Sequence, residues 1–413
     1  MAENSSKHRV LIVGAGIGGL VLAQCLRKQS IPFDVFERDD GPAARSGWAI
    51  GIHTLLDELV SSVPNDLPPF EDSVNHLTPL NLQVQLSLYL KDGRRVVQST
   101  PESRIVRANR LRLRTWLSDR IPIQWGKRLL RVEEVDDKVK LHFEDGTQAT
   151  GDILVGADGV NSVVREHVLR RPNKETLNTI PATMIIGETT LSGERFERQL
   201  SLGHSCYAKS AVDASYFLFV GLSQTSQNGT NGQYYWFVVR KDDEAGKEDH
   251  WLRSASQLEK LEHALKLTSP LDPRFTEIIR ETPESGILKH SQVLRDIEID
   301  ELPTGRITLL GDAAHTMTPF RGEGGVHAIR DALNLGKALG QLNSNECSEI
   351  KSLLGLYQEE MLERGVLAVR GSRNAQKVNS GEDGDARVWN RAPVEAPEEN
   401  ILLKDCLPGY VYT

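Results

Sequence analysis

The sequence predicts an α/β protein in which a Rossmann-like dinucleotide-binding domain is interrupted by an inserted antiparallel sheet and completed by C-terminal helices. An apolar run at residues 10–13 leads into a glycine turn and then a helical pattern at 20–28. Strand patterns crowd the region between residues 182 and 240, which indicates a second domain. Helical patterns return at 254–267, 323–342 and 348–370.

The glycine turn has the spacing of a phosphate-binding device. Gly14 permits the tight turn, Gly16 lets the backbone approach a pyrophosphate, and Gly19 lets the helix pack on the strand. Ile17 and Gly18 lie between them and belong to the same predicted contact. The pyrophosphate is expected at the helix N-terminus, where unpaired N–H groups and the helix dipole favour negative charge.

A second strand pattern at residues 33–36 ends at Glu37, about 20 residues beyond the glycines, where an acidic side chain typically binds ribose hydroxyls. A carboxylate there disfavours a 2′-phosphate, so the predicted dinucleotide is FAD or NAD rather than NADP. The alternative is that Glu37 is a solvated charge at a strand end.

Composition excludes several classes of function. The 413 residues, 39% of them hydrophobic, predict two or more folding units with sizeable cores. Lys plus Arg is 49 and Asp plus Glu is 57, and the net charge of −8 offers no attraction to nucleic acid or anionic lipid. The four cysteines are scattered, so neither a metal site nor a disulfide framework is predicted. Because no membrane span or signal peptide is evident, we expect a cytoplasmic protein.

Two further segments have the character of ligand-binding turns. The run from Gly156 to Arg165 follows a buried-looking strand and contains Asp158 and a serine N-cap, Ser162, although an ordinary strand-to-helix connection would look the same. In the run 307–315, Asp312 follows Gly311 at a strand end, where a carboxylate can accept hydrogen bonds from a polyol.

A glycine cluster comes shortly after this third segment. Gly322, Gly324 and Gly325 open the next long helix and offer backbone N–H groups to an electron-rich ring edge, and the alternative is a flexible loop before a helix. The region between the second and third segments is expected to form strands at 182–191, 199–212, 215–222 and 234–240.

The three segments, in this order, resemble the FAD-dependent monooxygenases of the para-hydroxybenzoate hydroxylase type, a single-component group that uses FAD and NADH or NADPH. The resemblance implies that the glycine turn binds ADP, that the Asp158 segment touches FAD, and that Asp312 binds ribityl or pyrophosphate oxygens. It also implies FAD contacts for Arg45 and for Arg110, which opens an Arg-x-x-Leu-x-x-x-Leu helix. The alternative for Arg110 is a solvated basic helix face.

The resemblance implies a discontinuous organisation. The FAD-binding domain would comprise residues 1–70, 105–175 and 285–372, and the substrate domain residues 71–104 and 176–284, leaving 373–413 as a surface-wrapping or mobile tail. One departure concerns Val326, which stands where many relatives have an asparagine and cannot replace its side-chain hydrogen bond. The neighbouring His327 is a possible compensation.

The implied reaction uses NADH or NADPH to reduce FAD, whose C4a-hydroperoxide then hydroxylates or epoxidises a small aromatic or polycyclic natural product. The chain has no second glycine fingerprint, so the nicotinamide cofactor is expected to dock transiently. Partners would be this substrate and O₂, in a monomer or homodimer, and the sequence is similar to fungal members that serve secondary metabolism. It shows no obvious carboxylate-binding signature for a simple benzoate.

Substrate and acid–base residues are predicted less sharply. The aromatic cluster at residues 234–237, with Tyr207, Tyr216 and Phe217, would line an apolar pocket or form ordinary core. Three histidines are candidate bases, and none is assigned a catalytic role: His53, His290 and His315. Alternative functions are a flavin-dependent reductase and a redox-sensing FAD-binding protein. A halogenase is disfavoured because its Trp-x-Trp-x-Ile-Pro segment is missing.

Overall fold

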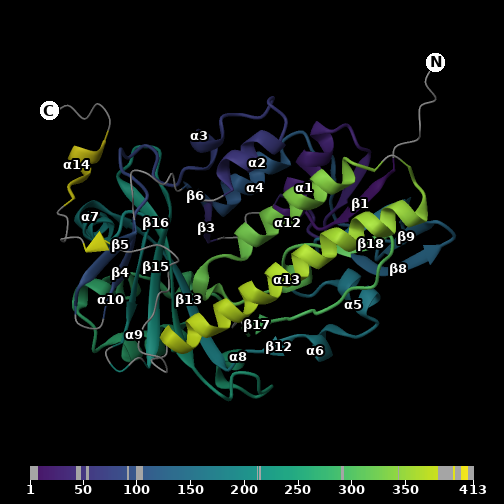
Figure 1. Ribbon diagram of the computed structural model, residues 1–413. Helices are drawn as coiled ribbons and strands as arrows, with labels where there is room; N and C mark the ends of the chain where they lie inside the picture. Colours follow the sequence, from purple (N-terminus) through teal and green to yellow (C-terminus); the bar gives the residue numbers. More distant parts are fainter. Residues whose placement is uncertain are drawn as a thin grey trace.

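The structure is a computed structural model. It describes residues 8–42, 48–52, 55–90, 93–98, 106–211, 213, 215–289, 293–342, 344–379, 394–395 and 401–407. Figure 1 shows two units side by side, one built on a parallel sheet and the other on a larger sheet.

The first unit is built on a five-stranded parallel sheet with the order β18-β11-β1-β2-β7. The strands are β1 (Val10–Val13), β2 (Phe33–Phe36), β7 (Ile123–Gln124), β11 (Ile153–Gly156) and β18 (Ile307–Leu309). Their apolar side chains are almost completely buried in a core shared with α1 (Ile17–Lys28) and α12 (Gly324–Leu339). Because β1, β11 and β18 are neighbours, the three turns that follow them lie at one edge of the sheet.

Smaller elements complete this unit. An antiparallel sheet is formed by β8 (Leu129–Val135), β9 (Lys138–Phe143) and β10 (Gln148–Gly151). The helices are α2 (Leu56–Ser62), α3 (Phe70–Val74), α4 (Arg110–Ser118), α5 (Val163–Leu169), α6 (Asn173–Thr176) and α11 (Asp312–His315). Short pairs join β3 (Ala49–Ile52) to β6 (Val106–Asn109) and β12 (Asn178–Thr179) to β17 (Arg295–Asp296).

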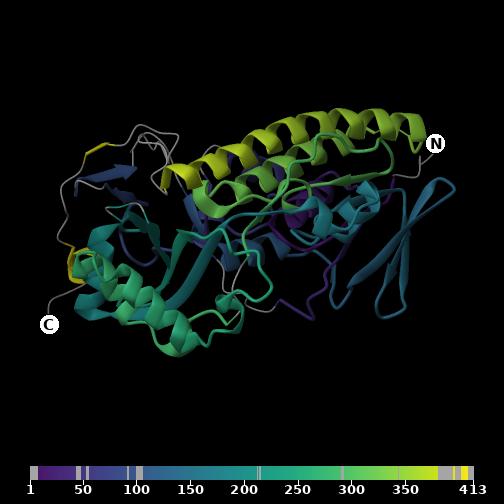
Figure 2. The same ribbon diagram turned by 90° about the horizontal axis from the view of Figure 1, so that it is seen from below.

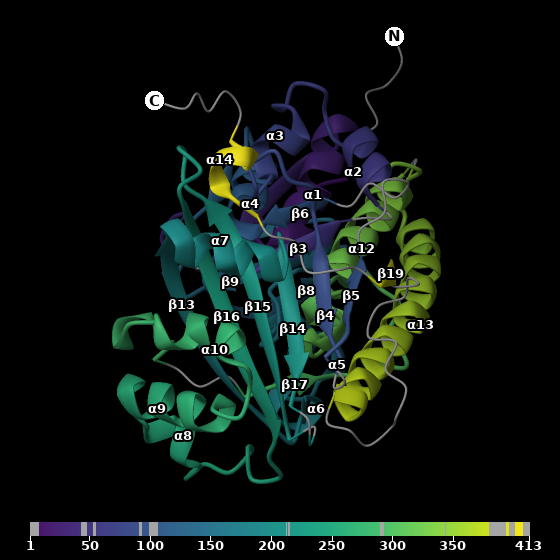
Figure 3. The ribbon, with the colours of Figure 1, turned by 90° about the vertical axis from the view of Figure 1, so that its left-hand side faces the viewer.

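The second unit is built on a seven-stranded sheet with the order β13-β16-β15-β14-β4-β5-β19 (Figure 3). Its strands are β4 (Leu86–Tyr89), β5 (Arg95–Gln98), β13 (Ala182–Ser192), β14 (Cys206–Ser210), β15 (Tyr216–Thr225), β16 (Asn231–Lys241) and β19 (Val394–Glu395). Every pair is antiparallel except β14 with β4, so the expected antiparallel sheet is confirmed with one parallel pair.

The two faces of the large sheet have different neighbours. One face packs on a core that includes Phe196, Ala264 and Ile278, contributed by three covering helices. These are α7 (Gly193–Leu202), α9 (Gln257–Thr268) and α10 (Pro273–Arg280), with α8 (Trp251–Ser254) beside them. The other face carries the side chains of Tyr235 and Phe237 and packs against residues that follow the third segment. This second face therefore looks toward the parallel-sheet unit.

A single long helix ties the two units together. Figure 2 shows α13 (Cys347–Asn379) running along the molecule from the parallel-sheet unit to the large sheet. Met361 is buried in the core of the first unit, and Ala375 packs against the aromatic face of the second. At the C-terminal end, α14 (Leu403–Cys406) buries Leu403 and Cys406 in the core of the large sheet.

One predicted element is wrong in part. Residues 199–212 were expected to form one strand, but α7 occupies 193–202 and β14 begins only at Cys206. The buried residues Phe196, Gln199 and Leu200 recur at helical spacing, and Gly193 starts the helix from φ +56°. Nowhere in the described ranges is a helix both long and apolar enough to traverse a lipid bilayer.

Candidate functional site

The glycine turn after β1 fits closely against the second segment. Gly14 has φ +111°, and a Cβ at this position would lie 2.2 Å from the Ala157 carbonyl oxygen. A Cβ on Gly19 would lie 2.1 Å from the Gly14 carbonyl oxygen. A Cβ on Gly16 would meet nothing within 4 Å, and Gly16 is the N-cap of the 12-residue helix α1. Gly14 and Gly19 therefore leave no room for a side chain, whereas Gly16 faces open space where a pyrophosphate could approach, in agreement with the predicted roles.

Glu37 lies beside this open room. Its carboxylate accepts hydrogen bonds from the Ala15 backbone N–H at 2.8 Å and the Asp39 N–H at 3.1 Å. A pocket at this place is lined by Ala15, Gly16, Glu37, Asp39, Arg110, Leu111 and Arg114. The structure thus brings three predicted residues, Gly16, Glu37 and Arg110, to one recess, whereas Arg45 lies outside the described residues.

Arg114 is a residue of this recess that the sequence reasoning missed. Its Nε donates to the Ala15 carbonyl oxygen at 2.9 Å, and its Nη2 lies 3.8 Å from the Glu37 carboxylate. The guanidinium also stacks over the Trp125 ring at 5.4 Å. Arg114 follows Arg110 by four residues on α4, so the helical spacing could have indicated that both reach the same recess.

The Asp158 carboxylate accepts hydrogen bonds from neighbouring groups of the protein. Its carboxylate accepts hydrogen bonds from the Ser162 hydroxyl at 2.5 Å and from the Val163 N–H at 2.7 Å, so it caps the start of α5. Ser162 in turn accepts from the Arg165 N–H, as expected of an N-cap. Direct binding of a cofactor by the Asp158 carboxylate stays a prediction, and the contacts favour the structural role.

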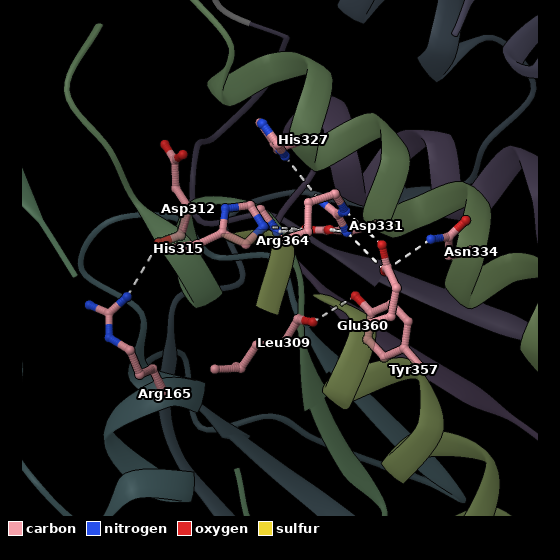
Figure 4. Close-up of polar contacts among 11 residues, drawn as sticks. Arg165, Leu309, Asp312, His315, His327, Asp331, Asn334, Tyr357, Glu360 and Arg364 are labelled. Atoms are coloured by element: carbon pink, nitrogen blue, oxygen red, sulfur yellow. Dashed lines mark hydrogen bonds and ion pairs between the residues drawn. The ribbon is translucent and has the colours of Figure 1, made fainter. Parts of the chain in front are cut away.

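Asp312 contrasts with Asp158. Its carboxylate points away from the neighbouring polar cluster (Figure 4), and within the described ranges it has no hydrogen-bond or ion-pair partner. Residue 312 is exposed, but desolvation by the protein around the carboxylate raises its pKa against the lowering effect of His315, Arg110 and Arg165. Gly311, at φ +59°, supplies the turn that aims the side chain outward. An acceptor without a partner in the described residues is suited to hydroxyl groups of a ligand.

Arg165 donates hydrogen bonds to the backbone at Asp312 and Ala313. The fully buried guanidinium of Arg165 donates to the Ala313 carbonyl at 2.9 Å and to the Asp312 carbonyl at 3.3 Å. It also bonds the Val160 carbonyl and the Asn173 side chain. The Arg165 side chain therefore joins the second and third segments. The sequence analysis predicted no role for it.

The glycine cluster lies close to Asp312. A Cβ on Gly324, the first residue of α12, would lie 3.9 Å from a carboxylate oxygen of Asp312. A Cβ on Gly325 would lie 2.9 Å from the Ile50 side chain of β3, and Gly322 turns the chain at φ +65°. The cluster is thus an ordered turn packed between β3 and the third segment, rather than the flexible loop of the alternative.

A buried ionic network lies directly behind this turn (Figure 4). The Asp331 carboxylate, completely buried in α12, lies 2.6 Å from His315 Nε2 and accepts from the Gly311 N–H at 2.7 Å. Arg364 of α13 donates to Asp331 at 2.7 Å and also binds Glu360. The network therefore holds the Gly311–Asp312 turn against two helices.

Neighbouring charges in the network outweigh the effect of burial on the pKa values of His315 and Asp331. Burial by itself lowers the pKa of His315, but the adjacent Asp331 carboxylate outweighs burial and raises it. Burial would raise the pKa of Asp331, but His315 and Arg364 outweigh it and hold that pKa below its usual range. Burial and the nearby Arg364 lower the pKa of His327 to about 4.

These shifts predict a pH dependence of stability. A raised pKa for His315 gives a contribution that is complete below about pH 6.5 and is lost as the pH rises through the folded-state pKa. The lowered pKa of Asp331 gives a contribution present above about pH 4 and lost as the pH falls through its folded-state value. We expect the difference in unfolding free energy between wild type and His315→Gln to shrink as the pH rises above about 6.5 and through the raised folded-state pKa of His315. The control His327→Gln should show no such slope, because His327 is neutral there, and a flat His315→Gln difference would contradict the charge assignment.

The glycine turn gives a second prediction with a matched pair of variants. Gly16→Ala should leave the melting temperature of the FAD-free protein nearly unchanged but weaken FAD binding about ten-fold or more, because its methyl group enters the predicted phosphate space. Gly19→Ala should instead destabilise the FAD-free protein, since its Cβ would overlap the Gly14 carbonyl. Thermal unfolding and FAD titration separate the two effects. Unchanged FAD affinity in Gly16→Ala would exclude this place for the pyrophosphate.

Other predicted residues are distributed as follows. Tyr234 and Trp236 point into the core under the helices, whereas Tyr235 and Phe237 lie on the opposite face. Tyr207 and Tyr216 are core residues, and Phe217 joins the aromatic face. His315 is engaged with Asp331, so a structural role is favoured over that of a base, while His53 and His290 lie outside the described residues.

The side chains of Val326 and His327 contact different parts of the protein. Val326 packs against the core of the parallel-sheet unit and supplies no polar group. His327 Nδ1 lies 3.0 Å from Arg364, so it contacts α13 and the buried network behind the turn. The two side chains therefore have different neighbours, and compensation of Val326 by His327 stays a prediction.

Comparison with known proteins agrees with this geometry. The FAD binding domain family matches residues 7–372. This chain belongs to the FAD-binding monooxygenases of the para-hydroxybenzoate hydroxylase type. It is therefore an oxidoreductase.

Two fungal members of this monooxygenase family are similar over most of their length. FAD-dependent monooxygenase thnD of Trichoderma harzianum is 46% identical over 381 residues, covering 90% of this chain and 94% of that protein. FAD-dependent monooxygenase cctM of Talaromyces islandicus is 30% identical, covering 93% of this chain and 96% of that protein. Such relatives agree with membership in the fungal secondary-metabolism group.

Solved monooxygenase structures share the fold. Klebsiella pneumoniae HpxO, in complex with FAD and uric acid, superposes with a TM-score of 0.71 at 23% identity, covering 91% of this chain and 90% of that one. The 2,6-dihydroxypyridine-3-hydroxylase of Arthrobacter nicotinovorans gives a TM-score of 0.72 at 18% identity, covering 97% and 100%. At these identities the likeness concerns the fold alone.

Proposed function

We propose that this protein uses NADH or NADPH and O₂ to hydroxylate or epoxidise a small aromatic or polycyclic natural product. The observation that carries the proposal is the position of the three turns at one edge of the parallel sheet, where the Asp312 carboxylate, without a partner in the described residues, lies beside the start of α12. Bound FAD would supply electron transfer and oxygen activation. The enzyme is proposed to be cytoplasmic and to act as a monomer or homodimer.

In this proposal the chain's own groups divide the work of holding FAD. Gly14 and Gly19 shape the turn, and Gly16 and the N–H groups of Ile17 and Gly18 face the pyrophosphate. Glu37 and Arg110 line the adenosine end, and Asp312 accepts hydrogen bonds from ribityl hydroxyls. Gly322, Gly324 and Gly325 provide backbone next to the ring edge.

The large sheet is proposed to form the substrate wall. Its aromatic face looks toward the parallel-sheet unit, and apolar side chains there would exclude water from a reactive centre. The domain boundaries expected from the sequence, with 71–104 and 176–284 as the substrate domain, remain part of the proposal. The nicotinamide cofactor would bind only while it delivers its hydride.

The test is a screen of the FAD-loaded protein against aromatic and terpenoid compounds, with NAD(P)H oxidation, O₂ uptake and ¹⁸O₂ incorporation measured together. The proposal expects substrate-stimulated NAD(P)H oxidation with one ¹⁸O atom in the product. A product that is reduced without O₂ uptake would indicate a reductase. A protein that binds FAD but turns over no nicotinamide would indicate a redox sensor.

A further inference from the structure

The chain between the third segment and the glycine cluster is bonded to α13 at one buried point. Thr318 precedes the short 3₁₀ helix η2 (Pro319–Arg321), and Ser372 lies on α13, 54 residues further along the chain. The Ser372 hydroxyl donates to the Thr318 carbonyl oxygen at 2.7 Å, and the two hydroxyl oxygens lie 2.8 Å apart. Because the single proton of Ser372 is directed to the carbonyl, the Thr318 hydroxyl is the donor of the second bond. Both side chains are buried, so loss of either hydroxyl would leave a polar group without its partner.

Glycines of α13 make room for side chains at both ends of the same stretch of chain. A Cβ on Gly365 would lie 2.8 Å from Cδ2 of His315, and a Cβ on Gly371 would overlap Nη1 of Arg321. The helix therefore packs closely along residues 315–321, and a side chain larger than glycine at these two places would push that stretch away.

The part of α13 next to Ser372 is itself anchored. Arg373 binds the Asp296 carboxylate with two hydrogen bonds of 2.8 Å, from Nε and Nη2. Asp296 is almost completely buried on β17, and Figure 1 shows the C-terminal part of α13 near this strand. The next residue, Ile297, donates its N–H to the Thr316 carbonyl oxygen at 3.1 Å. The chain before η2, β17 and α13 are therefore joined in one closed set of contacts.

The stretch held by α13 leads directly to the glycine cluster. Phe320 of η2 is buried and packs with the aromatic face of the large sheet. Gly322 ends η2 in a left-handed turn at φ +65°, and Gly324 begins α12. A Cβ on Gly324 would lie 3.8 Å from the Met317 side chain, so the two ends of this stretch also lie close together. A shift at Thr318 would therefore move the backbone of the glycine cluster.

We propose that Ser372 is a positioning residue, which holds η2 through Thr318 and thereby sets where the backbone of the glycine cluster meets the flavin ring. This inference rests on the proposed function, which places the ring edge beside Gly322, Gly324 and Gly325. Ser372 itself does not touch the cofactor. Its loss should therefore leave FAD bound but alter the surroundings of the ring.

The test measures the dissociation constant of FAD and, on the same samples, the visible circular dichroism of bound FAD, which reports the asymmetric surroundings of the ring. Ser372→Ala should change the visible spectrum most, because it removes both hydrogen bonds, and Thr318→Val should change it less. Thr318→Ser keeps the hydroxyl and should restore the wild-type spectrum. The dissociation constant should stay within about two-fold of wild type in all three variants, because in the described residues Ser372 shares no partner with Glu37 or Asp312.

Thr268 provides the matched control. Its buried hydroxyl donates to the Ala264 carbonyl oxygen at 2.8 Å inside α9, in the helical layer of the other unit. Thr268→Val should lower the melting temperature of the FAD-free protein as Thr318→Val does, but it should leave the spectrum of bound FAD unchanged.

The outcomes separate positioning from general stability. Should Ser372→Ala fail to fold, the comparison of Thr318→Val with Thr318→Ser decides. A wild-type spectrum in Thr318→Val and in any folded Ser372→Ala, or the same spectral change in Thr268→Val, would overturn the inference. All measurements use oxidised FAD without nicotinamide or substrate, so failure of oxygen incorporation would overturn only the proposed function.

Discussion

Asp312→Ala is expected to weaken FAD binding by roughly 10- to 100-fold, because each hydrogen bond to a charged group contributes about 1.5–3 kcal/mol. The carboxylate has no partner in the described residues and projects from the turn after β18. Removing it should therefore cost ligand contacts rather than internal ones. Titration of FAD-free protein with FAD, followed by flavin fluorescence, measures the effect.

Two further variants sharpen this result. Asp312→Asn keeps one acceptor oxygen and should lie between wild type and the alanine variant. Asp300→Ala removes an exposed carboxylate elsewhere on the surface and should bind FAD like wild type. If Asp312→Ala retains wild-type affinity, the carboxylate does not contact the cofactor.

Asp331→Ala is expected to lower the free energy of unfolding by about 3–5 kcal/mol, as is typical when one partner of a buried ion pair is removed. The substitution would leave the His315 ring, the Arg364 guanidinium and the Gly311 N–H without their shared acceptor. Chemical denaturation of FAD-free protein measures the loss. FAD affinity should fall as well, because the Gly311–Asp312 turn loses its anchor.

Glu58 supplies the matched control for this prediction. It forms ion pairs with Arg330 and Lys337, which lie on the same helix as Asp331 but are partly exposed. Because such surface pairs contribute little, Glu58→Ala should cost less than about 1 kcal/mol. A cost below that value for Asp331→Ala would show that the buried network does not stabilise the turn.

Local signals in the sequence predicted the cofactor-binding framework well. The strand, glycine turn and helix at residues 10–28 form as expected, because each step depends on neighbours in the chain. The helix beginning at Arg110 and the N-cap at Ser162 are confirmed for the same reason. The predicted strand at 199–212 was wrong at its start, where α7 ends at Leu202. Leu200 and Leu202 alternate as in a strand, but Phe196 and Leu200 have helical spacing.

Residues whose role depends on tertiary contacts could not be predicted. Arg165 joins turns that are about 150 residues apart in sequence, and Arg364 reaches Asp331 from a different helix. Ser372 has no distinctive sequence neighbourhood, and its contact with Thr318 arises only when α13 packs beside η2. The turns and the helices that follow them were therefore predictable from motifs, but the side chains that join these turns were not.

A crystal structure of the protein with FAD tests the central claim most directly. The account predicts the pyrophosphate at Gly16 and the N-terminus of α1, the adenosine ribose at Glu37, and a ribityl hydroxyl within hydrogen-bond distance of the Asp312 carboxylate. FAD bound elsewhere, or bound in this recess with Asp312 still facing solvent alone, would contradict it.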